Sequence, residues 1–134
     1  MIQQQTILKV SDNSGAKTAK CIKILGGYKK KTAKEGDMIV VTVQNLRDRV
    51  NLKRASKVKK KDIFKALVIR TKFILDKRSR IKIKFNDNSA ILLDKQSNPI
   101  GTRLIGFVSK KLNKKFPKLV ALSLKKFWIV SLNG

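Results

Sequence analysis

The sequence predicts a mainly β fold in the form of a small β-barrel. A succession of apolar runs of strand length is separated by polar or glycine-containing turns, and a helical pattern occurs only near the end of the chain. A length of 134 residues and a hydrophobic content of 42% are enough for one domain with a real core, residues 1–134.

The centre of the chain predicts neighbouring antiparallel strands. Three apolar runs follow one another there, at residues 65–72, 80–85 and 90–94. In the middle run Ile81 and Ile83 alternate with basic residues, so one face suits burial and the other suits negative charge. The pair Asp87-Asn88 tolerates left-handed backbone, which favours a tight hairpin turn before the third run.

Two further runs in the first third of the chain are predicted strands. Residues 6–10 form a short run that stops at residues 11–15, where Asp, Asn, Ser and Gly favour a turn. Residues 37–43 are apolar on both faces and rich in β-branched side chains. This pattern indicates a central strand that is covered on both sides.

Between these two lies a longer predicted strand, residues 17–25. Ile22 and Ile24 are expected to face the core, while Lys17 and Lys23 are drawn out to solvent. Two consecutive glycines end this strand.

The loop that follows, residues 26–37, combines glycines, an aromatic ring and lysines. Glycine lets a backbone approach a phosphate closely, and Lys29, Lys30 and Lys31 could then straddle RNA. Tyr28 beside them has two interpretations, stacking on a base or membership of a solvated hairpin tip. The sequence leaves both open.

A dense basic insert occupies residues 47–61 and contains few apolar side chains. Lysine runs are usually solvated, but at this density the like charges repel one another unless a counter-charge is present. We therefore expect a protruding ribbon or loop that becomes ordered on RNA.

The C-terminal part predicts one more strand and short helices. The strand is expected over residues 100–108, and Leu112 and Phe116 have the i, i+4 spacing of a helix face directed at the barrel. Ser109 is the expected N-cap of that helix, and Pro117 its end.

Two interpretations remain open for the tail. Residues 118–132 are apolar enough to pack as a final helix, although residues 127–130 fit an edge strand equally well. Phe64, Phe85 and Phe107 fall on apolar strand faces, and core positions are favoured for them over an exposed base-stacking platform.

Charge narrows the function. Lys and Arg number 33 against 8 acids, giving a net charge of +25. Such self-repulsion is tolerable mainly when a polyanion neutralises it, so nucleic acid is the expected partner class.

Catalytic and metal chemistry are disfavoured. The chain has no histidine, and its acids lie at no spacing typical of an acid/base pair or a metal site. The single cysteine, Cys21, falls within an apolar strand pattern and is expected to be a small core residue. No cofactor loop, targeting peptide or bilayer-length apolar run is visible. We expect a protein that is not an enzyme and that has no cofactor, metal, small-molecule substrate or membrane partner.

Several short segments carry a more specific signal. They are Met1–Thr6, Asp12–Ala16, Cys21–Gly27, Gly36–Asp37, Val68–Lys72 and Pro99–Gly106. In this order they resemble the universal large-subunit ribosomal protein number fourteen, of the bacterial and organellar type. The resemblance covers residues 1 to about 122.

That resemblance implies a five-stranded β-barrel with a projecting basic ribbon, residues 47–61, and a C-terminal helical region and tail, residues 109–134. It implies a structural constituent of the large ribosomal subunit that binds large-subunit rRNA and contributes to the intersubunit face and to bridges with small-subunit rRNA. A neighbouring large-subunit protein and a ribosome silencing factor are further expected partners. Composition alone leaves open an alternative, a free-standing basic β-barrel that acts as an RNA chaperone or translation factor.

Basic residues of the strands, the loop and the insert are the expected rRNA contacts. They are Lys17, Lys23, Lys29, Lys30, Lys31, Arg47, Arg49, Lys53, Arg54, Lys57, Lys59, Lys60, Lys61, Arg70, Lys72, Arg78, Arg80, Lys82 and Lys84. The resemblance places the intersubunit and silencing-factor face at Thr102 and Arg103, with Lys110 and Lys111 on the adjoining helix.

The chain also departs from the family that it resembles. Ser79 and Arg80 replace the usual Asp-Gly turn, the basic insert is longer, and the tail extends to Gly134. An enlarged, more basic version without a visible targeting peptide is typical of an organelle-encoded copy. This predicts a mitochondrial ribosome, with the plastid or the bacterial cytoplasm as alternatives.

Overall fold

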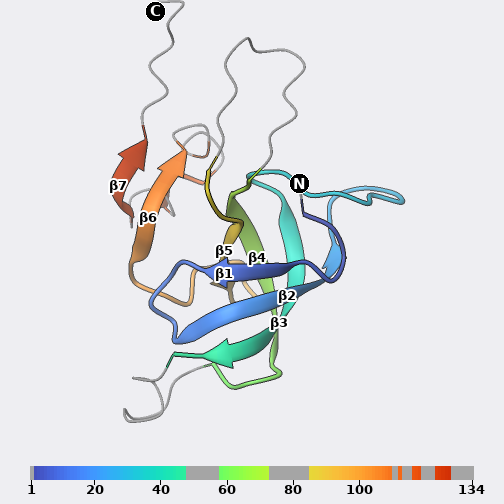
Figure 1. The fold of residues 1–134 in the computed structure, drawn as a ribbon, viewed down its shortest axis with the longest axis horizontal. Coiled ribbons are helices and arrows are strands. Elements are labelled where there is room, and N and C mark those ends of the chain that lie inside the picture. Colours follow the sequence, from blue (N-terminus) through green and yellow to red (C-terminus); the bar gives the residue numbers. More distant parts are fainter. Residues whose placement is uncertain are drawn as a thin grey trace, which may run out of the picture.

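The barrel predicted from the sequence is confirmed. The computed structural model describes residues 2–47, 58–72, 85–109, 112, 116–118 and 123–127. Five strands form a closed barrel (Figure 1): β1 (Ile7–Val10), β2 (Ala16–Ile24), β3 (Met38–Leu46), β4 (Ile63–Arg70) and β5 (Ser89–Leu93). A separate two-stranded sheet contains β6 (Leu104–Ser109) and β7 (Ser123–Phe127).

Strand pairing follows chain order until the barrel closes. The pairs β1–β2, β2–β3, β3–β4 and β4–β5 are all antiparallel. The barrel closes through a parallel pairing of β1 with β5, in which Lys9 lies opposite Ser89 and Val10 opposite Ala90. The first and last strands of the barrel therefore share one seam.

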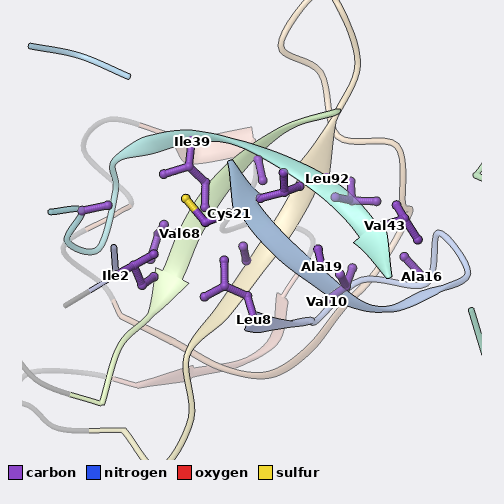
Figure 2. Packing of buried hydrophobic residues seen from close by; sticks show 14 of the residues in the cluster. Ile2, Leu8, Val10, Ala16, Ala19, Cys21, Ile39, Val43, Val68 and Leu92 are labelled. Atoms are coloured by element: carbon purple, nitrogen blue, oxygen red, sulfur yellow. The ribbon is translucent and has the colours of Figure 1, made fainter. Parts of the chain in front are cut away.

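The core fills the interior of this barrel because alternate residues of each strand point inward. Figure 2 shows Leu8, Cys21, Ile39, Val68 and Leu92 gathered there from five different strands. Cys21 is fully buried, as expected, and this burial raises the pKa of its thiol. A neutral, buried thiol is an inert packing group.

A second apolar cluster lies on the outer side of β4 and β5. Its buried members are Leu67, Ile69, Ile91, Leu93, Leu104, Val108 and Leu112. Since β4 and β5 also contribute alternate residues to the barrel interior, every residue of β5 is buried. Leu104 and Val108 of β6, together with Leu112, therefore cover one side of the barrel.

This arrangement corrects the prediction for residues 37–43. The inward-facing residues of β3 are fully buried, but the alternate residues Met38, Val40 and Thr42 are only partly buried. The strands covered on both faces are β4 and β5, because β6 and Leu112 pack over them instead.

The prediction that Ile22 faces the core is wrong, whereas that for Ile24 is confirmed. Ile22 is 43% exposed and Ile24 is buried. The register of β2 against β3 shifts between Cys21 and Lys23, so Ile22 is the extra residue of a β-bulge. A bulge breaks the period-two alternation, and Cys21 replaces Ile22 on the inner face.

The C-terminal predictions have mixed outcomes. Leu112 is buried, Phe116 packs against the second cluster, and the Phe116 amide donates to the Leu112 carbonyl at 2.8 Å, as in a helical turn. Ser109 ends β6, and the elements of the described residues include no helix. Pro117 is not a helix end, because it begins a short helical stretch with Lys118.

The final helix expected over residues 118–132 is wrong at residues 123–127, which form β7 in parallel with β6. Of the alternative edge strand expected at residues 127–130, only Phe127 lies among the described residues, and it is the last residue of β7. The core prediction for Phe107 is wrong, because Phe107 is 49% exposed on the outer face of β6. Phe64 packs partly buried against the barrel core, and Phe85 is half-buried.

Two predicted segments fall largely outside the described residues. They are the alternating run at 80–84 and most of the basic insert, residues 48–57. Among the described residues, no helix has the length and apolar character needed to cross a bilayer.

Adjacent residues of β1 provide a test of the register. Leu8 is fully buried and Ile7 is 63% exposed. Leu8→Ala should lower the free energy of unfolding by about 2–5 kcal/mol through lost burial and the cavity left behind. Ile7→Ala should change it by about 0.5 kcal/mol or less. Urea unfolding of both variants measures these changes. Equal losses of stability would contradict the assignment of Leu8 to the inner face of β1 and Ile7 to the outer face.

Candidate nucleic-acid interface

The turn between β1 and β2, residues 11–15, connects three parts of the molecule. Asp12 is buried there, and its Oδ1 accepts hydrogen bonds from the amide and the hydroxyl of Ser14. Its Oδ2 accepts from the Leu92 amide of β5 at 3.1 Å. The Ser11 carbonyl accepts from the Ile105 amide of β6 at 2.6 Å. This one turn is therefore hydrogen-bonded both to β5 within the barrel and to β6 outside it.

Burial raises the pKa of Asp12 above its ordinary value of 3.8. The hydrogen bonds from Ser14 and Leu92 and the positive charge of Arg47 oppose this rise, but loss of solvent around the carboxylate outweighs them. Asp12 is therefore a structural acid whose ionised form is kept in place by several donors.

Asn13 fixes the backbone of the predicted intersubunit residues. Its Oδ1 accepts from the amides of Thr102 at 2.7 Å and Arg103 at 3.2 Å, and its Nδ2 donates to Thr102 Oγ1 at 2.8 Å. A Cβ atom at Gly101 would lie only 2.8 Å from both Asn13 Oδ1 and Asp12 Cβ, so this approach requires glycine. Thr102 and Arg103 remain exposed on this fixed loop.

Arg70, a predicted rRNA contact, points into the protein. Its side chain is 11% exposed, and its Nη2 donates to the hydroxyls of Ser11 and Ser89 at 2.6 and 2.8 Å. Its Nε lies 3.3 Å from Oδ1 of Asp87. Gly106 leaves room for the guanidinium, since a Cβ there would lie 2.1 Å from Nη1. These contacts give Arg70 a structural role.

A basic groove lies beside the same turn. It is lined by Lys9, Val10, Lys17, Thr18 and Arg47. The Arg47 guanidinium is held by a 3.1 Å hydrogen bond from Nη2 to the Val10 carbonyl, while Lys17 is exposed. Three cations line this groove, which forms a surface suited to a phosphate backbone.

The lysines at the end of the insert are also exposed. Lys59, Lys60 and Lys61 form the turn into β4, where Asp62 Oδ2 accepts from the Lys59 amide and the Lys61 amide donates to Val43. Lys61 has a φ of 69°. The backbone of this turn is fixed, and the three ammonium groups are directed to solvent.

A second group of cations belongs to the loop between β2 and β3. Lys29 and Lys31 are exposed there, and Lys23 is exposed near the end of β2. Lys30 differs, because its Nζ lies 2.8 Å from Oδ2 of Asp37. Of the three lysines predicted to straddle RNA, Lys30 is committed to an internal ion pair.

The predicted cations therefore gather in two regions rather than one. Lys17 and Lys23 lie near opposite ends of β2 and are about 20 Å apart at the strand rise per residue. The region near Lys17 also contains Arg47 and the groove, and the region near Lys23 contains the projecting loop. Lys72, at the end of β4, is exposed beside Asn88, which accepts from its amide at 2.8 Å.

The remaining predicted basic residues lie outside the described residues. They are Arg49, Lys53, Arg54, Lys57, Arg78, Arg80, Lys82, Lys84, Lys110 and Lys111. Within residues 2–47, 58–72 and 85–109, no three acidic or cysteine side chains are grouped as metal ligands would be.

Sequence reasoning missed Lys9 and the role of Asn13. Lys9 occupies an exposed position of β1 and lines the groove, which the alternation of that strand could have indicated. Asn13 was recognisable as a turn residue, but no local pattern reveals its contacts with Thr102, which is 89 residues away in the sequence.

Asp12→Asn tests the buried carboxylate through its pH dependence. Because the native pKa is raised, the folded protein binds this proton more tightly than the unfolded chain. Asp12 ionisation should therefore lower the free energy of unfolding as the pH rises from 3.8 through the native pKa. The Asp12→Asn variant has no carboxyl group at this position, so its free energy of unfolding should fall less over this pH range.

Urea unfolding of both proteins from about pH 3 to about pH 7 gives the comparison. As the pH rises, the free energy of unfolding of the variant should increase relative to that of wild type. A difference that is constant, or that moves in favour of aspartate, would contradict the raised pKa.

Two comparisons with known proteins identify the family of this chain. The family model described as ribosomal protein L14p/L23e matches residues 1–127. The large ribosomal subunit protein uL14 of Carsonella ruddii (strain PV) is 48% identical over 124 residues, which is 92% of this chain and 97% of the relative. The resemblance noted in the sequence is thereby confirmed, and the chain belongs to the ribosomal protein L14p/L23e family.

Proposed function

We propose that this chain is a structural, non-enzymatic constituent of the large ribosomal subunit that binds large-subunit rRNA. Membership of the ribosomal protein L14p/L23e family supports the structural role. The RNA-binding part of the proposal rests on the distribution of charge. Most exposed lysines of the described residues have no acidic side chain beside them.

Asp12, Asp37, Asp62, Asp87 and Asp94 are each engaged locally. Asp37 pairs with Lys30, Asp87 pairs with Arg70 and lies 4.0 Å from Lys9, and Asp12 is buried. Asp62 and Asp94 accept hydrogen bonds from backbone amides of their own turns. Within the described part of the chain, acidic partners within 4.0 Å are found only for Lys9, Lys30 and Arg70.

The other exposed cations are consequently available for phosphates. Lys17 and Lys59–Lys61 are exposed on the side of the barrel where β2 starts, and Lys23, Lys29 and Lys31 are exposed at or near the loop after its other end. Phosphate contacts fix the position of a protein on RNA. Two separated basic regions on one rigid barrel suit a protein that holds two rRNA segments at a set distance.

The intersubunit role is assigned to the loop held by Asn13. Arg103 is exposed, and its backbone is fixed by the same carboxamide that binds Thr102. A planar guanidinium on a fixed backbone is suited to bidentate contact with phosphate or carboxylate. We assign small-subunit rRNA, or the acidic surface of a silencing factor, as the partner of this loop, while a neighbouring large-subunit protein remains an expected partner elsewhere.

Sedimentation tests the main proposal against its alternative. Stoichiometric presence in the large subunit after a high-salt wash is expected of a structural constituent, whereas release into the free fraction is expected of an RNA chaperone or translation factor. Sedimentation of organelle and cytoplasmic fractions also tests the mitochondrial, plastid and bacterial locations, all of which remain predictions.

Salt dependence tests the phosphate contacts. Replacing Lys59, Lys60 and Lys61 together by Ala should flatten the log–log dependence of rRNA affinity on salt, by about 2 in slope if each lysine contacts one phosphate. A filter-binding titration at several salt concentrations measures the slope.

The matched control removes the same charge from Lys65, Lys95 and Lys118, which are exposed but lie outside the predicted contacts. This control should keep the wild-type slope. Equal slopes for the two triple variants would show that residues 59–61 are only a solvated surface.

Arg103→Glu tests the intersubunit surface. The variant should still enter large subunits, because Arg103 contributes its side chain to no described internal contact, but it should weaken joining to small subunits or binding of a silencing factor. Reassociation of purified subunits at fixed magnesium, with and without the factor, measures both. Lys95→Glu supplies the same charge change as a control.

Normal joining and normal factor binding by Arg103→Glu would refute this assignment. Loss of incorporation would instead place Arg103 on large-subunit rRNA.

A further inference from the structure

The loop between β2 and β3 is a projecting finger, residues 25–37, that carries an unsupported aromatic ring. Figure 1 shows it as the light-blue loop extending from the barrel at the right. Tyr28 lies in the turn at residues 28–29 and is 91% exposed. An aromatic ring in this position adds nothing to the core and is accessible to a partner outside the chain.

The finger is fixed at its base. Asp37 Oδ2 accepts from Lys30 Nζ and from the Lys34 amide, both at 2.8 Å. The backbones of Ile2 and Ala33 exchange hydrogen bonds of 3.1 and 2.7 Å, and both side chains are fully buried. These contacts hold the finger in place without any contribution from Tyr28.

The turn itself positions the ring. Gly26 has a φ of 94° and Lys29 a φ of 49°, so the chain reverses through left-handed backbone at two points. The Lys30 side chain lies against Gly27, at 3.5 Å from a Cβ placed there, and runs back toward Asp37. Tyr28 lies within this reversal and is exposed there.

Charge around the ring identifies the class of partner. Lys29 Nζ lies 5.4 Å from the centroid of the Tyr28 ring, over one face. Lys31 and Lys23 are exposed nearby in the chain, and the finger's Asp37 is already paired. A ring flanked by free cations matches the combination of stacking and phosphate contact that single-stranded nucleic acid requires.

We propose that Tyr28 stacks on an unpaired base of large-subunit rRNA, with Lys29 and Lys31 at the adjoining phosphates. The base is unpaired because the ring needs access to a whole base face, which a continuous helix denies. Lys30 is the positioning residue, since its ion pair with Asp37 fixes the finger. This inference rests on the proposed function and assigns one contact within it.

The test uses the full chain and full-length large-subunit rRNA of the same organism, transcribed in vitro. Tyr28→Ala and Tyr28→Leu should each weaken binding by about 5- to 150-fold, the range found for single base–aromatic stacks. Tyr28→Phe should bind like wild type, because stacking uses the ring and not the hydroxyl. None of the three changes charge, so the salt slope should stay unchanged, whereas Lys29→Ala should reduce it by about 0.7.

Ultraviolet crosslinking and mass spectrometry of assembled large subunits identify the partner directly. A nucleotide adduct on Tyr28, the only tyrosine of the chain, supports the proposal. An adduct with another protein overturns it, as does equal binding by Tyr28→Ala and wild type, or a loss in Tyr28→Phe as large as in Tyr28→Ala.

The proposed function and this inference fail in different ways. If wild type shows no salt-sensitive affinity for the rRNA, rRNA binding itself is refuted. If wild type binds and Tyr28→Ala binds equally well, only the stacking contact is refuted. Thermal unfolding of each variant should match wild type, because Tyr28 makes no buried contact.

Discussion

The hydrogen bonds of the Asp12 carboxylate are the constraint on which the rest of the structure depends. One oxygen caps the β1–β2 turn through Ser14, and the other holds the Leu92 amide of β5. The residues on either side of Asp12 extend this connection, since Ser11 accepts from Ile105 of β6 and Asn13 binds Thr102 and Arg103. Barrel closure, attachment of the small sheet and presentation of the proposed intersubunit loop therefore depend on one short turn.

The charges of the protein are sorted by role. Three half-buried cations are each held by a specific acceptor: Asp37 for Lys30, Asp87 with two serine hydroxyls for Arg70, and the Val10 carbonyl for Arg47. Other cations, such as Lys17, Lys29 and Lys59, are exposed. A buried charge without a partner is costly, whereas exposed lysines of like charge are stabilised by binding a polyanion. The fold thus uses some basic residues as structural groups and leaves others exposed to solvent.

Local patterns predicted the barrel well because each strand contains an apolar run of strand length and most turns contain glycine, asparagine or aspartate. They failed where a partner strand decides the outcome. Ile22 is turned outward by a bulge in its pairing with β3, and Phe107 is exposed because β6 packs on the barrel through its other face. The candidate site shows the same limit. The exposed lysines were recognisable from charge alone, but the inward direction of Arg70 results from serines at positions 11 and 89 that only the closed barrel brings to it.

The parallel seam between β1 and β5 has a consequence for how the chain folds. Asp12 and Leu92 are 80 residues apart in the sequence, so the seam cannot form until most of the chain has been synthesised. The hairpin partners β3 and β4 can associate earlier because their contacts are more local, whereas bringing β1 to β5 must overcome the entropy of closing a long loop. Until then β1 has a free edge, and a basic chain with an open edge is prone to nonspecific association. Closure of this seam is therefore the expected slow step of folding. It converts the nascent chain into a folded protein that can enter ribosome assembly.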